Sequence, residues 1–107
     1  MITVKYDRKK YRLTAKGHAM SADKGNDLVC SAASILLYTL ASNVQELAAC
    51  SHDYRRPRII LAEGDAEISI SPVHGKGSVA TLVFDSICRG FELLSKDYPE
   101  NVKFTLI

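Results

Sequence analysis

The chain has 107 residues, of which 47% are apolar and 24% are charged, and its formal net charge is +2. This size and composition predict a single domain, 1–107, with one hydrophobic core. A charge so near zero gives no electrostatic sign of a nucleic-acid partner. Three cysteines, an odd number without the paired spacing of small secreted scaffolds, argue against a disulfide framework and favour a reducing cytoplasm.

The sequence shows no sign of a secretory signal or a membrane anchor. Its first residues alternate like a β-strand and lack the basic segment and apolar core of a signal peptide. The longest apolar stretch, 28–49, contains Asn43, Gln45 and Glu46, and we expect it to be too polar for a transmembrane span. The prediction is a cytoplasmic protein without a membrane partner.

The first half of the chain predicts a hairpin and a long helix. Alternating residues indicate strands over 2–6 and 11–15, joined by a polar turn at 7–10. The segment 19–26 has no periodicity and is expected to be a loop. Apolar residues then recur with helical spacing over 27–49, which predicts a long amphipathic helix.

The second half repeats this order with little sequence similarity to the first. Strands are predicted over 59–63 and 66–71, with a two-residue turn at Gly64-Asp65 between them. A second amphipathic helix is predicted over 78–96, and a last alternating strand over 101–107.

The predicted order is β-β-α-β-β-α-β, which indicates an α+β fold. Two hairpins and a terminal strand can form one mainly antiparallel sheet, and the two helices can cover one face of it. The domain then has two layers, and the other face of the sheet is left to solvent or to a partner.

Two residues with catalytic chemistry flank the predicted loop: His18, in Gly-His-Ala, and Cys30, twelve residues later. A cysteine attacks as the thiolate, whereas a free thiol has a pKa near about 8.5. We expect Cys30 in the first helical turn, where exposed N–H groups and the helix dipole favour an anion. His18 can take the thiol proton and later protonate a leaving amine. A free cysteine also serves as a small core residue, so the residues alone leave packing as the alternative.

Neighbouring residues are expected to support this pair. Asp27 either caps the helix through backbone N–H groups or orients His18 as the third member of a triad, and the sequence leaves both roles open. Ser34 lies one helical turn after Cys30, where it either donates a hydrogen bond at the site or packs as a small residue. Backbone N–H groups at the helix start, including that of Cys30, are the expected oxyanion hole.

The pattern over 17–34 reads Gly-His-Ala, five residues, then Gly-x-Asp-x-Val-Cys-x-Ala-x-Ser. It resembles the signature of the ribosomal-processing cysteine protease family, often called Prp, and the predicted layout resembles that family over essentially the whole chain. The resemblance implies that His18 and Cys30 form a catalytic dyad. It further implies that Gly17 opens the motif and that Gly25 and Asp27 shape the loop and the helix start. The sequence departs from the family at the residue after the cysteine, where serine replaces the usual alanine without a large change in size.

The resemblance also implies a function. The family removes a short N-terminal extension from a bacterial large-subunit ribosomal protein (L twenty-seven), and its members are commonly homodimers. No cofactor is implied. A peptide substrate would bind beside the loop that joins the two catalytic residues and complete the site.

The residues also allow an alternative function. A non-catalytic ribosome-associated binding or assembly module could use the basic cluster 55–58 and the uncovered sheet face. So short a basic run is usually solvated surface, and direct RNA binding stays open. No metal site is expected, because the remaining cysteines and histidines match no common zinc-ligand spacing.

Overall fold

The computed structural model describes residues 1–17 and 24–107, the side chains of 24–27 excepted. Its elements follow the predicted order along the chain. They are β1 (Ile2–Asp7), β2 (Arg12–Lys16), α1 (Lys24–Cys50), β3 (Arg58–Ala62), β4 (Asp65–Ser69), α2 (Ser78–Asp97) and β5 (Val102–Leu106).

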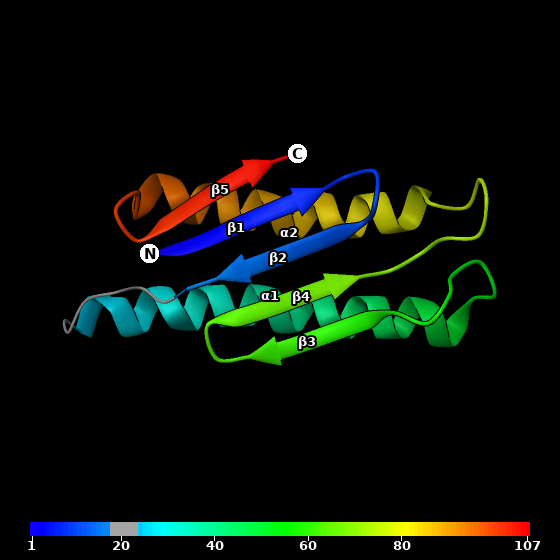
Figure 1. The fold of residues 1–107 in the computed structure, drawn as a ribbon, viewed down its shortest axis with the longest axis horizontal. Coiled ribbons are helices and arrows are strands. Elements are labelled where there is room, and N and C mark those ends of the chain that lie inside the picture. Colours follow the sequence, from blue (N-terminus) through cyan, green and yellow to red (C-terminus); the bar gives the residue numbers. More distant parts are fainter. Residues whose placement is uncertain (18–23) are drawn as a thin grey trace.

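The five strands form one sheet in the order β3-β4-β2-β1-β5 (Figure 1). The pairs β1–β2, β2–β4 and β3–β4 are antiparallel. Only β5 runs parallel to its neighbour β1, because α2 carries the chain back across the sheet before β5 begins. The prediction of a mainly antiparallel sheet is confirmed, and β3 and β5 are its two edges.

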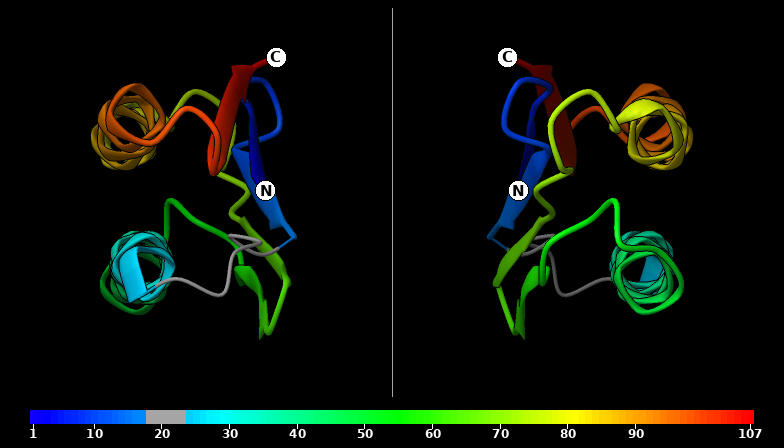
Figure 2. Two further views of the ribbon diagram at one scale, coloured as in Figure 1. Left: turned by 90° about the vertical axis from the view of Figure 1, so that its left-hand side faces the viewer. Right: turned by 90° about the vertical axis from the view of Figure 1, so that its right-hand side faces the viewer.

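Both helices lie on the same face of the sheet, side by side and antiparallel (Figures 1 and 2). In these views α2 lies behind β1 and β5, whereas α1 lies behind β4 and β3. The described chain places no helix on the opposite face, so the two-layer α+β architecture is as predicted. On that opposite face, the alternate polar side chains of the strands point away from the helices.

The core forms where the alternating strand residues meet the apolar faces of the helices. Tyr6 of β1 is almost fully buried, and its ring stacks on Phe84 of α2 at a centroid distance of 5.1 Å. Burial raises the pKa of the Tyr6 hydroxyl above its ordinary value, so this side chain is neutral in the folded protein. The side chains that are completely excluded from solvent include Val4, Leu13 and Ile68 from the sheet.

One turn differs from its prediction by a residue. Ala62 pairs with Asp65, so the two-residue turn is Glu63-Gly64 and not Gly64-Asp65. Gly64 has a φ of +72°, a conformation that glycine adopts without the steric cost of a side chain. Gly64 correctly indicated a turn here, but it occupies the second position of the turn and not the first.

The helix α1 is more apolar than expected. Its segment Leu28–Cys50 has a mean hydropathy of 1.4 and is long and apolar enough, by length and composition, to cross a membrane. The expectation that it was too polar is wrong by this criterion, although core helices of soluble proteins meet the same criterion. Here Val29, Leu40 and Val44 are buried in the core, while about a quarter of the segment, 28%, is buried overall.

Candidate active site

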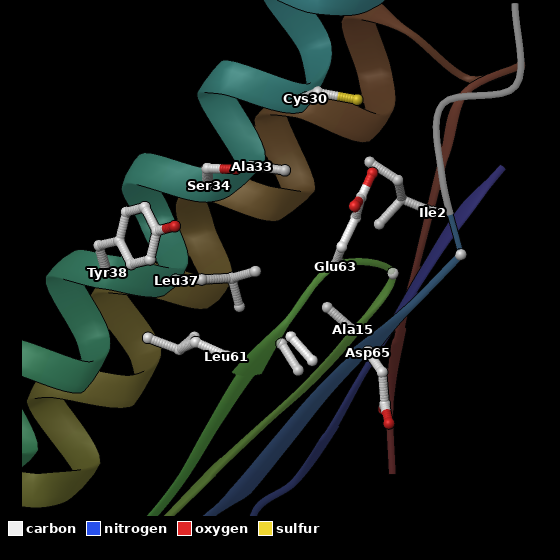
Figure 3. A pocket seen from close by; sticks show the side chains of 14 residues that line it. Ile2, Ala15, Cys30, Ala33, Ser34, Leu37, Tyr38, Leu61, Glu63 and Asp65 are labelled. Atoms are coloured by element: carbon white, nitrogen blue, oxygen red, sulfur yellow. The ribbon is translucent and has the colours of Figure 1, made fainter.

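A cavity of about 330 Å³ lies between the N-terminal half of α1 and the β3–β4 turn (Figure 3). Cys30, Ser34 and Leu37 line it from α1, and Leu61 and Glu63 line it from the hairpin. The Cys30 thiol is half-buried, and the view shows it on one wall with the Glu63 carboxylate extending from the other. The cavity therefore combines an accessible thiol, an apolar wall and two acidic side chains, Glu63 and Asp65, of which Asp65 pairs with Lys16 at 3.0 Å.

Cys30 and Ser34 occupy successive turns on the same flank of α1, as their spacing predicts. Both side chains are partly exposed. Ser34 thus lines the cavity and is partly accessible to a ligand, and its two predicted roles, as a hydrogen-bond donor or as a small packing residue, both stay predictions. Its hydroxyl is the polar side-chain group nearest in sequence to Cys30 that lines the cavity.

The start of α1 differs from the prediction and changes two expected roles. The helix begins at Lys24, so Asp27 lies within its first turn and is not its N-cap. Cys30 is consequently in the second turn, where its backbone N–H is used by the helix itself. The Cys30 amide is therefore not the expected oxyanion-hole donor, and the dipole effect, which fades after the first turn, acts less strongly on its thiol than expected.

Gly17 connects β2 to the catalytic motif and is fixed at the same cavity. Its N–H donates to the carbonyl oxygen of Gly64 at 2.9 Å, and its φ is +94°. A Cβ atom at this position would collide with the carbonyl oxygen of Met1. Glycine is required here because both the conformation and the close approach exclude a side chain.

The predicted partner of Cys30, His18, lies outside the described residues. Gly25 and Asp27 are described only through the backbone of the first turn of α1. The structure nevertheless brings Gly17, the residue before His18, and Cys30 to one cavity, although thirteen positions separate them in the sequence.

The other two cysteines have surroundings that oppose ionisation. Burial raises the pKa of Cys88 to about 12, and the nearby Asp85 carboxylate acts in the same direction. Cys50 is exposed at the end of α1, where the Glu46 carboxylate raises its pKa. Neither residue lines the cavity.

Most residues that line the cavity were not predicted from the sequence, and Leu61 and Glu63 are examples. Leu61 and Glu63 belong to the β3–β4 hairpin, which was predicted only as a structural element. Leu61 lies opposite buried Ala66 in β4, so the period-two alternation does indicate that it faces the helices. The sequence carries no comparable signal that this hairpin lies beside the cysteine, where it lines the cavity together with Ile2, Ala15 and Gly17 of the first hairpin.

The basic cluster 55–58 is less uniform than the sequence suggested. Arg55 and Arg56 are exposed, but the Arg58 Nε donates to the Glu67 Oε2 at 2.7 Å. Within residues 1–17 and 24–107, no three histidine, cysteine or acidic side chains gather in a way that could hold a metal ion.

An accessible thiol on a helix, in a cavity closed by a hairpin turn, defines a candidate cysteine enzyme. The model of the cysteine protease Prp family matches residues 1–103. The chain therefore belongs to this family.

Solved structures share the fold over the full length of the chain. The essential ribosomal processing protease Prp of S. aureus in complex with a substrate peptide is 23% identical, with a TM-score of 0.76 and 100% coverage of both chains. The same protease with a covalently linked product peptide is 22% identical, with a TM-score of 0.75 and the same coverage. The protein SMU.848 of Streptococcus mutans is 23% identical, with a TM-score of 0.67 and coverage of 99% of this chain and 91% of that one. No curated protein matches the chain.

Proposed function

We propose that this chain is an endopeptidase that removes a short N-terminal extension from a bacterial large-subunit ribosomal protein (L twenty-seven). The observation that carries the proposal is the half-buried Cys30 thiol in a cavity large enough for peptide side chains, in a chain of the Prp family. The S. aureus protease is a ribosomal processing enzyme with a structure in complex with a substrate peptide, which supports a substrate of this kind.

In the proposed reaction the Cys30 sulfur attacks the carbonyl carbon of the scissile peptide bond. His18 accepts the thiol proton and then donates it to the nitrogen of the leaving amine as the C–N bond breaks. The new N-terminus of the ribosomal protein departs, and the extension remains as a thioester on Cys30. Water then hydrolyses the thioester, releasing the extension as a carboxylate and restoring the thiol. The covalently linked product peptide of the S. aureus protease supports a covalent route.

The position of Gly17 supports the role of His18. Gly17 is anchored to Gly64 at the cavity, so the chain enters the catalytic motif beside the Cys30 wall. Ser34, one turn from Cys30, is placed to donate a hydrogen bond to a bound peptide. The donors of the oxyanion hole are proposed to come from backbone N–H groups other than that of Cys30.

We also propose that the enzyme is a cytoplasmic homodimer without a cofactor or a membrane partner. Free cysteines throughout the described chain are in keeping with a reducing compartment. Exposed apolar side chains on the helix layer, among them Leu28, Ile35 and Leu82, support self-association.

The test is cleavage of the purified unprocessed ribosomal protein, followed by mass spectrometry. We expect Cys30→Ala to reduce kcat/KM by at least about 10³-fold, since the nucleophile is lost, with the fold retained in circular dichroism. His18→Ala should cause a loss of similar size. The matched control is Cys50→Ala, which removes an exposed thiol outside the cavity and should cleave normally. Cleavage by Cys30→Ala at the wild-type rate would exclude the proposed nucleophile.

The alternative of a non-catalytic ribosome-binding module has less support. The pairing of Arg58 with Glu67 leaves a smaller free basic cluster than the sequence indicated. Family membership among cysteine proteases favours an enzyme. No observation favours the module independently.

A further inference from the structure

We propose that the substrate segment preceding the scissile bond binds as an extra β-strand along the exposed edge of β3, in a groove between β3 and α1. This inference rests on the proposed function, because it takes Cys30 as the cleaving residue. It adds the mode of substrate recognition: backbone pairing with β3, with alternate apolar side chains directed toward α1.

The first observation is the free edge of β3. Among the residues that the structure describes, this strand pairs with β4 alone and is the end strand of the sheet. Ala62 and Asp65 flank the two-residue turn, and residues along an antiparallel pair alternate between hydrogen-bonded and non-hydrogen-bonded positions. The backbone N–H and C=O groups of Leu61 and Ile59 therefore point away from β4 and are open to another strand.

The second observation is the composition of this edge. Residues 59–62, Ile-Ile-Leu-Ala, carry no charge, and the Leu61 side chain is 41% exposed. Exposed apolar edge strands favour pairing with another chain, and natural proteins usually protect them with charges or prolines. The lack of such protection along most of β3 indicates an edge that is used for binding.

The third observation is that two cavities lie one after the other beside this edge. A second, more open cavity of about 550 Å³ is lined by Gln45, Ala48 and Ala49 of α1 and by Ile59 of β3. Its α1 residues continue the helical flank that carries Cys30 and lines the first cavity. The α1 residues that line the first cavity are Cys30, Ala33, Ser34, Leu37 and Tyr38, and those that line the second are Gln45, Ala48 and Ala49. The two sets are seven residues apart, about two helical turns, so they lie on one side of α1.

The dimensions of the groove fit a short extended peptide. From Cys30 to Ala48 the helix rises by about 27 Å, which corresponds to about eight residues of a β-strand. A free N-terminal extension can enter such a groove, whereas the folded body of the ribosomal protein must remain outside beyond Cys30. The C-terminal end of the extension is the scissile bond, which must lie at Cys30. The C-terminal end of β3 also lies near Cys30, so the extension runs parallel to β3.

The chemistry of the groove selects the side chains of this strand. Leu37 and Leu61 face its catalytic end, and Ala48 and Ile59 face its other end. Every second side chain of an added strand points toward this apolar surface, and the others point away from the helix layer. The apolar lining near Cys30 therefore favours apolar residues at alternate positions close to the scissile bond, whereas the far end also presents Gln45 and Arg56.

The experiment replaces peptide backbone N–H groups without changing side chains. Synthetic peptides spanning the extension and the first residues of the mature ribosomal protein carry one amide-to-ester substitution each, at successive positions before the scissile bond. We expect kcat/KM to fall by about tenfold at every second position, where an N–H donates to β3, and to change less than about twofold between them. Equal effects at neighbouring positions would overturn strand addition. Failure to cleave the unmodified peptide would overturn the proposed function, and with it this inference.

A pair of enzyme variants tests the same proposal from the side of the protein. Leu61→Ala is expected to raise KM for the unmodified peptide by about tenfold, because the side chain faces the groove. The matched control is Ile60→Ala in the same strand, whose side chain lies on the opposite face of the sheet and should leave KM unchanged. Equal effects of the two variants would contradict the proposal. Loss of the dimer in Leu61→Ala would also overturn it, since a second copy would then occupy this edge.

Discussion

At the scale of single residues, the three cysteines differ in burial, in nearby charge and in access for a ligand. Cys88 is buried and its pKa is raised to about 12, so its thiol is protonated and shielded at neutral pH. Cys50 is exposed, but the Glu46 carboxylate, whose Oε1 lies 3.6 Å from its sulfur, raises its pKa. Cys30 alone among them lies in a cavity with access for a ligand.

Alkylation by iodoacetamide should therefore be selective for Cys30. At neutral pH we expect Cys30 to react at least about tenfold faster than Cys50, since the thiolate is the reacting form. The measurement is peptide mapping by mass spectrometry over a time course. His18→Ala should slow the Cys30 reaction, if His18 holds its proton. Similar slow reaction of all three thiols would contradict an activated Cys30.

The sequence identified Cys30 and Gly17 as site residues but misplaced the local geometry. Segment 27–49 has the strongest helical periodicity, yet α1 begins at Lys24, before that periodicity is evident. Polar residues that precede an apolar stripe can continue a helix without adding to its pattern, so boundaries are poorly fixed by periodicity. This is why the helix starts three residues earlier than predicted, with Asp27 inside its first turn and Cys30 inside its second.

At the scale of elements, Tyr54 supports the start of α2 across the polar connection. Its hydroxyl accepts a hydrogen bond from the Ala80 backbone N–H at 3.2 Å, and the residue is buried. The helix cap itself, Gly77, makes no side-chain hydrogen bond. Tyr54 thus satisfies one of the free N–H groups at the helix N-terminus in place of a capping side chain.

Tyr54→Phe should lower the free energy of unfolding by about 1 kcal/mol, the usual cost of losing a helix cap or leaving a buried donor unpaired. Urea denaturation followed by circular dichroism measures this change. Tyr38→Phe is the matched control, because Tyr38 is exposed and its hydroxyl should contribute little. A loss below about 0.3 kcal/mol for Tyr54→Phe would show that water replaces the tyrosine hydroxyl.

The types of most elements were predictable because their apolar residues recur with a strand or helix period, whereas β3 was predicted as a short apolar run beside a turn. The strict alternation of Val102, Phe104 and Leu106 is an example, and these residues form β5. The neighbours of each strand were not predictable, because period-two alternation indicates which face is buried but not which strand lies beside it. The edge position of β3, on which the groove depends, therefore emerged only from the fold.

At the scale of the whole molecule, the helix layer presents apolar surface away from the core. Leu28 and Ile35 on α1 and Leu82 and Leu93 on α2 are each more than half exposed. In addition, no charged residue occurs between Leu28 and Gln45 on α1. Exposed apolar surface of this kind usually marks an interface, and the proposed homodimer supplies a second copy to cover it.

We therefore expect the chain to have twice the monomer mass in light scattering at micromolar concentration. Ile35→Glu should shift it toward the monomer, because a buried, unpaired carboxylate would be costly in the interface. Gln45→Glu places the same charge on another flank of α1 and should leave the dimer intact. A monomeric wild-type chain, or equal behaviour of the two variants, would contradict this interface.

The central claim is that Cys30 cleaves the N-terminal extension of the ribosomal protein. The most direct measurement is the N-terminus of that protein, determined by mass spectrometry in cells that carry either the wild-type chain or Cys30→Ala. We predict a trimmed N-terminus with the wild-type chain and the full extension with the variant at equal abundance of the two enzymes. A trimmed N-terminus in both cells would contradict the claim.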